Sequence, residues 1–224
     1  MRPLIRWAPG RTGAALIALA ALAAGTPARA QESWALEGYL GAVWNAPTPL
    51  SIHQAGQDDI KLTAHYETRP LEQPPYYAWR VGRWTKDRAW EFEFIHHKLF
   101  LDNPPDEVQH FEVTHGFNML VINRAVVRKK IIWRLGGGVV LAHPEPQVRG
   151  VEPPEGGGLR GRGYHLTGPV VQGSLGRRFA LTDNLFFAIE AKLIAAYARF
   201  PVDDGHAATS NLALHGLFGL GYAF

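Results

Sequence analysis

The stretch 89–101, AWEFEFIHHKLFL, alternates large apolar residues with carboxylates before it ends in two histidines and a lysine. In a β-strand, Trp90, Phe92 and Phe94 would point to one side while Glu91 and Glu93 point to the other. A strand of this kind needs an apolar surrounding on one face and a polar surrounding on the other. Its fold therefore depends on which face meets water.

The same period of two recurs along the chain, with turn-rich gaps between the alternating segments. Most of these segments can supply the roughly 9–11 residues that a tilted strand needs to cross a bilayer. None shows a sustained apolar stripe of period 3.6, so helix is disfavoured. The eight predicted strands are 33–45, 75–84, 89–100, 108–123, 130–142, 163–180, 185–200 and 208–224.

The alternation in each segment predicts a strand with one apolar face and one face that carries charges. In 185–200, for example, leucine, phenylalanine, isoleucine and tyrosine share the face opposite Glu190 and Lys192. A narrow barrel of eight strands is filled by side chains, and buried charges must be paired there. The residues predicted to pair inside are Glu37, Arg80, Glu91, Glu93, Arg134, Glu190 and Lys192.

A soluble sandwich also alternates, with its apolar face inside. Two features favour the membrane barrel: aromatic residues recur at strand ends, where interface girdles belong, and the chain ends in GLGYAF. Such an ending resembles the C-terminal strand through which the barrel-assembly machinery recognises its clients. The predicted fold is all-β, an eight-stranded antiparallel transmembrane β-barrel, up-and-down and closed, in the outer membrane of a Gram-negative bacterium.

The first thirty residues predict a cleaved secretory signal peptide, and 31–224 the barrel domain. Arginines precede the apolar run 14–25, and TPARA ends at Ala30 as an Ala-x-Ala cleavage signature. This segment holds four of the 23 Lys and Arg and no acid, which leaves 19 basic against 20 acidic residues. The net charge of +3 therefore gives no reason to expect a nucleic-acid partner. Without cysteine, the exported domain cannot use disulfides.

Gap lengths predict the topology, because short turns of such barrels face the periplasm and long loops face outward. KDRA (86–89) and LTDN (181–184) are short, whereas 46–74 and 143–162 are long and rich in proline and glycine. The outer loops are thus expected at 46–74, 101–107, 143–162 and 201–207. We interpret 58–67 as a hairpin arm within the first of them.

Histidines concentrate in the predicted outer half of the barrel. Neighbouring strands would bring His97, His110, Glu112, His143 and Glu145 near one another. Imidazole with carboxylate can bind a divalent metal or exchange protons near neutral pH. The predicted metal ligands are His97, His110, Glu112 and His143. Separately, His96 and Lys98 share the parity of Phe92 and Phe94 at headgroup height, where they would bind lipopolysaccharide phosphates.

Several ordered blocks resemble a family of outer-membrane barrels that includes the rhizobial lipid A oxidase. They are NAPTPLSIHQ (45–54), YYAWRVGRW (76–84), FIHHK (94–98), HGFNMLVIN (115–123), LGGGVVLAHPE (135–145), GYHLTGPVVQ (163–172) and AIEAK (188–192). The family pattern falls on His96 and Lys98, Gly116 and Asn118, His143 and Glu145, and Gly168 and Pro169. The chain departs from it at Thr114-His115, where an aspartate is expected, and at Ala142, where a proline is expected.

The resemblance implies oxidation of the proximal glucosamine of lipid A to 2-aminogluconate. Catalytic residues would be His110, Glu112, Asn118, His143 and Glu145, with dioxygen as co-substrate, a divalent metal and no organic cofactor. Lipid A and outer-membrane lipid are the expected partners. One alternative is a non-catalytic barrel with a structural or ligand-binding role, and another is a soluble periplasmic β-protein that binds an apolar ligand. A serine-type lipid A deacylase ranks lower, because neither Ser174 nor Ser210 has a histidine two residues before it.

Overall fold

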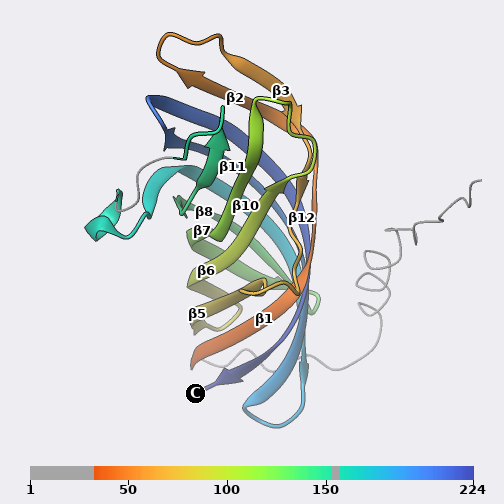
Figure 1. The fold of residues 1–224 in the computed structure, drawn as a ribbon. Coiled ribbons are helices and arrows are strands. Elements are labelled where there is room, and N and C mark those ends of the chain that lie inside the picture. Colours follow the sequence, from red (N-terminus) through yellow and green to blue (C-terminus); the bar gives the residue numbers. More distant parts are fainter. Residues whose placement is uncertain (1–32, 153–156) are drawn as a thin grey trace, which may run out of the picture.

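The computed structural model describes residues 33–152 and 157–224 as one antiparallel sheet (Figure 1). Eight long strands follow one another around it: β1 (Ser33–Asn45), β5 (Tyr77–Thr85), β6 (Arg88–Leu101), β7 (Val108–Arg128), β8 (Ile131–Ala142), β10 (His165–Ala180), β11 (Leu185–Val202) and β12 (Gly205–Ala223). The last pairs with the first, from Ala35 opposite Ala223 to Asn45 opposite Ala213. This pairing closes the barrel, removes its free edges and confirms the predicted fold.

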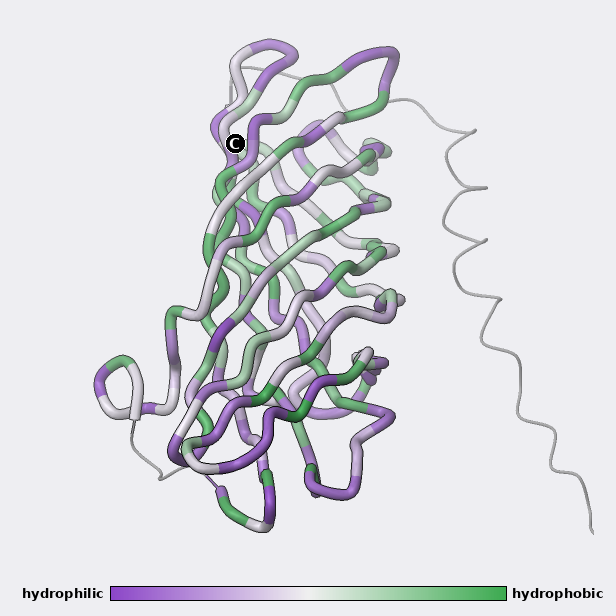
Figure 2. The backbone as a smooth tube through the Cα atoms, turned by 90° about the horizontal axis from the view of Figure 1, so that it is seen from above, coloured by the Kyte–Doolittle hydropathy of each residue, from purple (hydrophilic) through white to green (hydrophobic). Residues whose placement is uncertain are grey.

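The two faces of the wall have opposite chemistry. In the opening stretch Trp90 is 61% exposed whereas Glu91 is 1% exposed. The same holds on β8, where Leu135 is 73% exposed and Arg134 is buried. Figure 2 shows hydrophobic and hydrophilic residues interleaved along the strands of the wall. Apolar side chains therefore cover the outside of the cylinder, as a bilayer requires, and the charged ones lie within.

The buried charges form one ion-pair network in the lumen. Arg80 lies 2.8 Å from a carboxylate oxygen of Glu93 and 2.9 Å from one of Glu190. Arg134 contacts Glu190 at 2.9 Å and Glu91 at 2.7 Å. All seven charged residues predicted for the interior are buried, and Lys192 and Glu37 complete the network through Glu93 and Arg178. Because every charge has opposite partners, the desolvation that an isolated ion would suffer is offset.

At one end of the barrel the wall continues beyond the apolar band, which is the part of the outer surface covered by exposed apolar side chains. There β2 (Thr48–Gln54) and β3 (Ile60–Ala64) form a hairpin whose first arm pairs with the start of β12. Of the stretch 58–67, which was interpreted as a hairpin arm, Ile60–Ala64 is that arm, whereas Tyr66–Glu67 pairs with β6 instead. Two short strands, β4 (Tyr66–Glu67) and β9 (Glu145–Val148), extend β6 and β7. Apolar side chains fill this extension, among them Leu50, Ile52, Leu99, Phe111 and Phe200.

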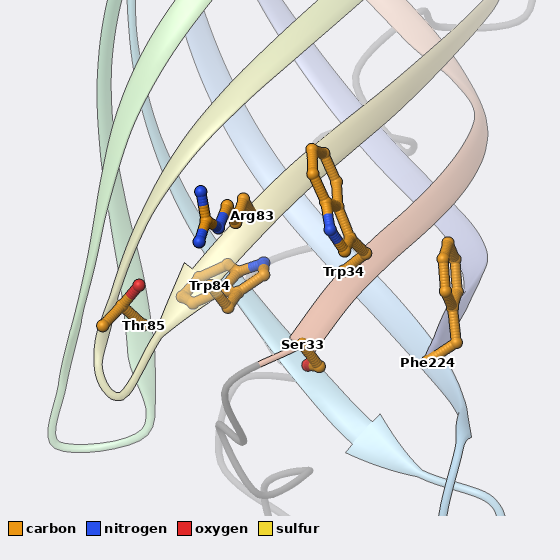
Figure 3. A pocket seen from close by; sticks show the side chains of 6 residues that line it. All are labelled: Ser33, Trp34, Arg83, Trp84, Thr85 and Phe224. Atoms are coloured by element: carbon orange, nitrogen blue, oxygen red, sulfur yellow. The ribbon is translucent and has the colours of Figure 1, made fainter.

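Short turns at the other end join β5 to β6, β7 to β8 and β10 to β11, and both described chain ends lie there (Figure 1). This arrangement agrees with the predicted placement of short turns at one end and loops at the other. The expected outer loop 201–207 is an exception, because β11 and β12 remain paired up to Val202 and Gly205 and leave a tight turn there. Three aromatic side chains, Trp34, Trp84 and Phe224, lie around a hollow at this end (Figure 3). The hollow is lined by Ser33, Trp34, Arg83, Trp84, Thr85 and Phe224. The predicted signal peptide, 1–30, lies outside the described residues.

Regular helix is limited to one short turn, η2 (Leu159–Gly161), in the described part of the chain. No helix among the described residues is long and apolar enough to cross a membrane.

Candidate functional site

A β-bulge where β6 meets β7 prepares the candidate site. His97 pairs with Phe117 and Leu99 with Val113, so the single residue between them on β6, Lys98, faces three residues on β7. Those three are Thr114, His115 and Gly116. Bulges of this kind re-aim side chains and often lie beside functional sites. Here the bulge turns the His115 side chain to the outer surface, where it is 60% exposed.

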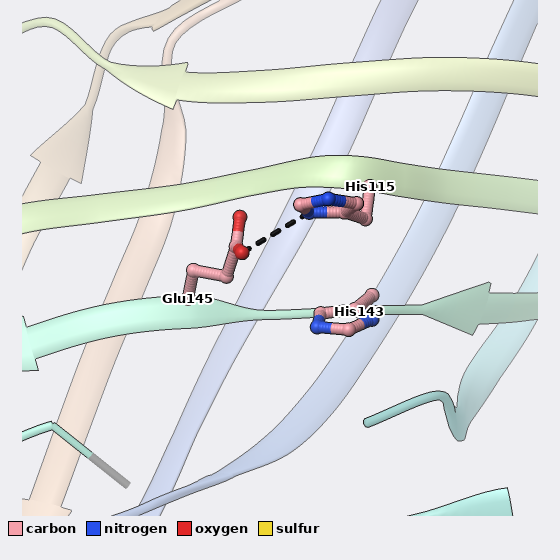
Figure 4. A group of neighbouring side chains, drawn as sticks. All are labelled: His115, His143 and Glu145. Carbon is pink, nitrogen blue, oxygen red and sulfur yellow. Dashed lines mark ion pairs between the residues drawn. The ribbon is translucent and has the colours of Figure 1, made fainter. Parts of the chain in front are cut away.

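His115, His143 and Glu145 then converge on the outside of the wall, and we call these three residues the lateral cluster (Figure 4). Their ligand atoms lie within 4.8 Å of one another, and they are the one such group of three in the described residues. His115 Nδ1 lies 3.0 Å from Glu145 Oε1, and the two imidazole rings are 5.0 Å apart between centroids. Thr114 donates a hydrogen bond to the other carboxylate oxygen of Glu145.

Backbone geometry holds the cluster in place. His143 follows the last residue of β8, and its backbone N–H donates to the carbonyl of Gly116 at 3.1 Å. Tyr164 packs edge-on against the His143 ring at 5.0 Å and donates its hydroxyl to the carbonyl of His115 at 3.1 Å. Gly163 has φ +72°, and a Cβ there would lie 2.6 Å from the His143 ring. The ring can occupy its position only because residue 163 has no side chain.

The lateral cluster lies just beyond the apolar band. Ala142, immediately before His143, pairs with both Phe117 and His165. One step along β10 from His165, Leu166 is 64% exposed on the outer surface. The cluster therefore lies next to residues that suit contact with lipid. In a barrel of this kind, that position corresponds to the headgroup level of the outer leaflet.

Burial lowers the pKa of His143, with His115 and His165 acting in the same direction and Glu145 opposing them. A lowered pKa keeps the imidazole neutral at pH 7, which leaves a lone pair for a metal or a proton. Nδ1 of His143 is buried without a hydrogen-bond partner. Two imidazoles and one carboxylate in such an arrangement suit Fe²⁺ or another divalent transition metal with coordination positions left open.

The Gly-x-Asn motif has a structural reason. His96 Nδ1 lies 2.8 Å from Asn118 Oδ1, and the two residues form a cross-strand pair. Gly116 has φ +124°, and a Cβ at that position would overlap the carboxamide of Asn118. Glycine is needed there both for the backbone and for the space. Tyr77 stacks on the other face of the His96 ring, at 5.0 Å between centroids.

The structure divides the predicted metal ligands. His143 lies in the lateral cluster, and Glu112 is the cross-strand neighbour of Glu145 on the same outward face. His110 pairs with Gln147, one further step along that face. His97 instead points into the lumen and is fully buried, so it does not join His143. Odd-numbered residues of 91–97 point to the inner face of the strand, as the alternation in the sequence implied. His97 is one of them.

His96 and Lys98 were expected to be open to lipid phosphates, and the structure covers both. His96 is 5% exposed and Lys98 is fully buried. The segment between β4 and β5 folds over Lys98, whose Nζ donates to the carbonyl of Glu72 at 2.8 Å. Arg69, from the same segment, stacks on the Phe100 ring at 4.2 Å. Sequence alone did not show that this part of the first outer loop turns back onto the wall.

His115 is the member of the lateral cluster that the sequence analysis did not select. The sequence analysis noted Thr114-His115 only as a departure from the resembled pattern and assigned it no role. Ser174, considered for a deacylase, lies in the lumen beside Lys192 and away from lipid.

The closed cylinder, its apolar outer wall and its charged interior define an eight-stranded outer-membrane β-barrel protein. No protein-family model matches the chain, and no curated protein matches it. Among solved structures, the chain is similar in its course to the outer membrane protein AlkL, at 10% identity over 90% of this chain and 94% of that one, with a TM-score of 0.48.

Two further solved structures share this course. OprG from Pseudomonas aeruginosa matches at 10% identity over 89% of this chain and 98% of its own, with a TM-score of 0.46. The attachment invasion locus protein Ail of Yersinia pestis matches at 10% identity over 87% and 100%, with a TM-score of 0.39. The assignment of the fold rests on the strand register and the two faces of the wall described above.

Proposed function

We propose that this outer-membrane barrel is an enzyme that modifies lipid A from its lateral cluster. The observation that carries the proposal is the position of His115, His143 and Glu145, which face outward beside the apolar band. A substrate there must come from the membrane itself, and the saccharide–phosphate part of lipid A lies at that level of the outer leaflet. The lumen offers no competing route, because apolar side chains fill its outer end.

The reaction we propose is oxidation of the proximal glucosamine at its anomeric carbon. The free hemiacetal C1–OH loses two electrons and two protons to give a lactone, and dioxygen accepts them to give hydrogen peroxide. Water then opens the lactone to the 2-aminogluconate. A metal held by His115, His143 and Glu145 would supply the dioxygen chemistry. The family resemblance of 45–54, 94–98, 115–123 and 135–145 supports this choice of reaction.

The residues of the chain divide the remaining work. Glu112 is adjacent to Glu145 on the outward face, so it is placed to accept the proton of the hemiacetal hydroxyl. Asn118 holds His96 at the lower edge of the cluster. Because the reacting C1 must carry a free hydroxyl, the phosphate that would meet Arg160 and Arg162, which are exposed on the turn next to Gly163, is one carried by the distal sugar of lipid A. Lys98 reaches phosphate only if the segment that covers it moves aside.

The test is mass spectrometry of lipid A from cells that carry or lack the gene, grown with oxygen. The account predicts lipid A species that gain one oxygen atom only when the gene is present. His143→Ala and Glu145→Gln should abolish this species, whereas His53→Ala, in the exposed hairpin, should retain it. An unchanged lipid A spectrum in cells with well-folded barrel would refute the enzyme and favour a non-catalytic barrel.

A further inference from the structure

Two neighbouring strands carry aromatic residues on the outer face of the wall. Tyr77 and Trp79 of β5 point outward, as do Trp90, Phe92 and Phe94 of β6, because they alternate with buried residues. The Trp79 ring centroid lies 5.5 Å from that of Phe92 and 5.9 Å from that of Phe94, and the centroids of Tyr77 and Phe94 are 5.9 Å apart. We call these five residues the aromatic stripe.

The aromatic stripe crosses the apolar band instead of lying at one edge of it. On the adjacent strand β1, Trp34 and Trp44 are exposed on the outer face, and a rise of about 3.3 Å per residue separates them by about 33 Å. A strand tilt of about 40° reduces this to a height of about 25 Å, which is the height of the apolar band in such barrels. Trp34 therefore marks the inner edge of the band, at the end with short turns, and Trp44 marks the outer edge. Aromatic residues concentrate at these two edges in other barrels, so a stripe between them is a local feature of β5 and β6.

Three arginines surround the inner end of the aromatic stripe. Trp90 pairs with Arg83 of β5 on one side and with Arg124 of β7 on the other, and Arg88 precedes it on β6. The Arg124 guanidinium lies 5.2 Å from the centroid of the Trp90 ring and donates to the Ala89 carbonyl at 3.3 Å. The side chain of Arg124 therefore bends toward the end with short turns, as arginine does when its charged head reaches the membrane interface.

Carboxylates of the protein neutralise these arginines only weakly. Within the described residues, Arg83 and Arg124 form no ion pair, and Arg88 lies 3.9 Å from Asp87 in a pair whose two side chains are more than half exposed. The outward-facing positions of β5 and β6 hold no acidic residue. Arg83 also lines the hollow shown in Figure 3. A cationic group thus faces the headgroup level of the inner leaflet, next to an aromatic surface that faces the acyl chains.

We propose that this surface binds one anionic glycerophospholipid of the inner leaflet. Its phosphate lies between Arg83 and Arg124, and one acyl chain runs along the aromatic stripe. Only β6 separates the strands of the two arginines, so their backbones are about 10 Å apart and both guanidinium groups can reach one phosphate over Trp90. A zwitterionic headgroup carries an ammonium group that the arginines repel, so the surface selects a lipid with net negative charge. This proposal is independent of the lateral cluster and of the enzyme activity proposed for it.

The experiment uses the full-length barrel in vesicles of phosphatidylcholine that contain a small share of one brominated lipid. Bromine quenches the fluorescence of nearby tryptophans, so quenching reports which lipid lies against the wall. Attraction to one arginine favours an anionic lipid by about fivefold. Brominated phosphatidylglycerol should therefore quench as though it were concentrated severalfold at the wall, relative to brominated phosphatidylcholine at the same share.

Two double variants separate a binding site from a general effect of charge. Arg83→Gln with Arg124→Gln should abolish the excess quenching by phosphatidylglycerol. Arg128→Gln with Lys129→Gln is the matched control, because it removes two positive charges from the exposed turn between β7 and β8 at the same end of the barrel. The control should keep the excess. Heat-modified migration on gels verifies that each variant is folded.

Two single substitutions locate the bound lipid. Trp90→Phe should remove most of the excess, because the reporting ring lies between the two arginines, whereas Trp44→Phe at the outer edge should leave it unchanged. The proposal is overturned if both brominated lipids quench the wild type equally, if the variant without Arg83 and Arg124 keeps the excess, or if the turn control loses it to the same extent. Protection of Trp90 from both lipids would assign this face to a second copy of the barrel and would also overturn the proposal.

Discussion

Glu190 provides the sharpest test of the lumenal network, because its carboxylate joins the two arginines. It accepts hydrogen bonds from Arg80 at 2.9 and 3.1 Å and from Arg134 at 2.9 Å. Glu190→Gln keeps the shape of the side chain but removes the negative charge. Both arginines stay in place. The number of charged glutamates within 4 Å of Arg80 falls from four to three.

The expected loss of unfolding free energy depends on the ion pairs that the two arginines keep. Removing one partner of a buried ion pair costs about 3–5 kcal/mol. Arg80 keeps Glu93 and Arg134 keeps Glu91, so we expect the lower end, about 3 kcal/mol. With a urea m-value of about 3 kcal/mol/M for a chain of this size, the unfolding midpoint should fall by about 1 M.

The assay is urea unfolding of the barrel in lipid vesicles, followed by tryptophan fluorescence. Asp59→Asn is the matched control, because Asp59 forms an exposed pair with Lys61 in the outer hairpin and its loss should leave the midpoint unchanged. Adding Lys192→Met to Glu190→Gln removes a cation from the same network and should restore part of the loss. A Glu190→Gln midpoint equal to that of the Asp59 control would refute the network as a source of stability.

Three other perturbations test separate parts of the structure. Leu135→Arg, on the outer face of β8, should destabilise the barrel in vesicles by about 2–4 kcal/mol, whereas a water-exposed position would tolerate it. Gly116→Ala should displace Asn118 and abolish the oxidised lipid A without unfolding the barrel, which gel migration would verify. Because burial lowers the pKa of His143, its imidazole in the metal-free barrel should take up a proton only below the ordinary histidine value of about 6.5, as followed by an NMR titration of that ring. A His143 midpoint at or above the ordinary histidine pKa would contradict this expectation.

The barrel was predictable because period-two alternation is a local signal. Trp90 and Glu91 differ in exposure as their parity required, and all seven charges assigned to the interior are inside. The lengths of the sequence gaps between strands then distinguished the end with short turns from the end with long loops. Each of these inferences needs only the residues within one strand and the physical difference between lipid and a filled lumen.

The candidate site was less predictable, because it depends on contacts between segments that are distant in sequence. The bulge that places His115 outside is a mismatch of one residue against three between β6 and β7, and neither strand alone reveals it. The segment that covers Lys98 comes from the first outer loop.

The most direct measurement is a spin-label scan of β8 in lipid vesicles, one residue at a time from 131 to 141. The chain has no cysteine, so each label needs only a single substitution. The structure predicts that odd positions, such as Trp133 and Leu135, collide readily with membrane-dissolved oxygen, while even positions such as Arg134 are shielded from both oxygen and water-soluble reagents. Odd positions open to the water-soluble reagent, or no alternation at all, would contradict a wall that faces lipid.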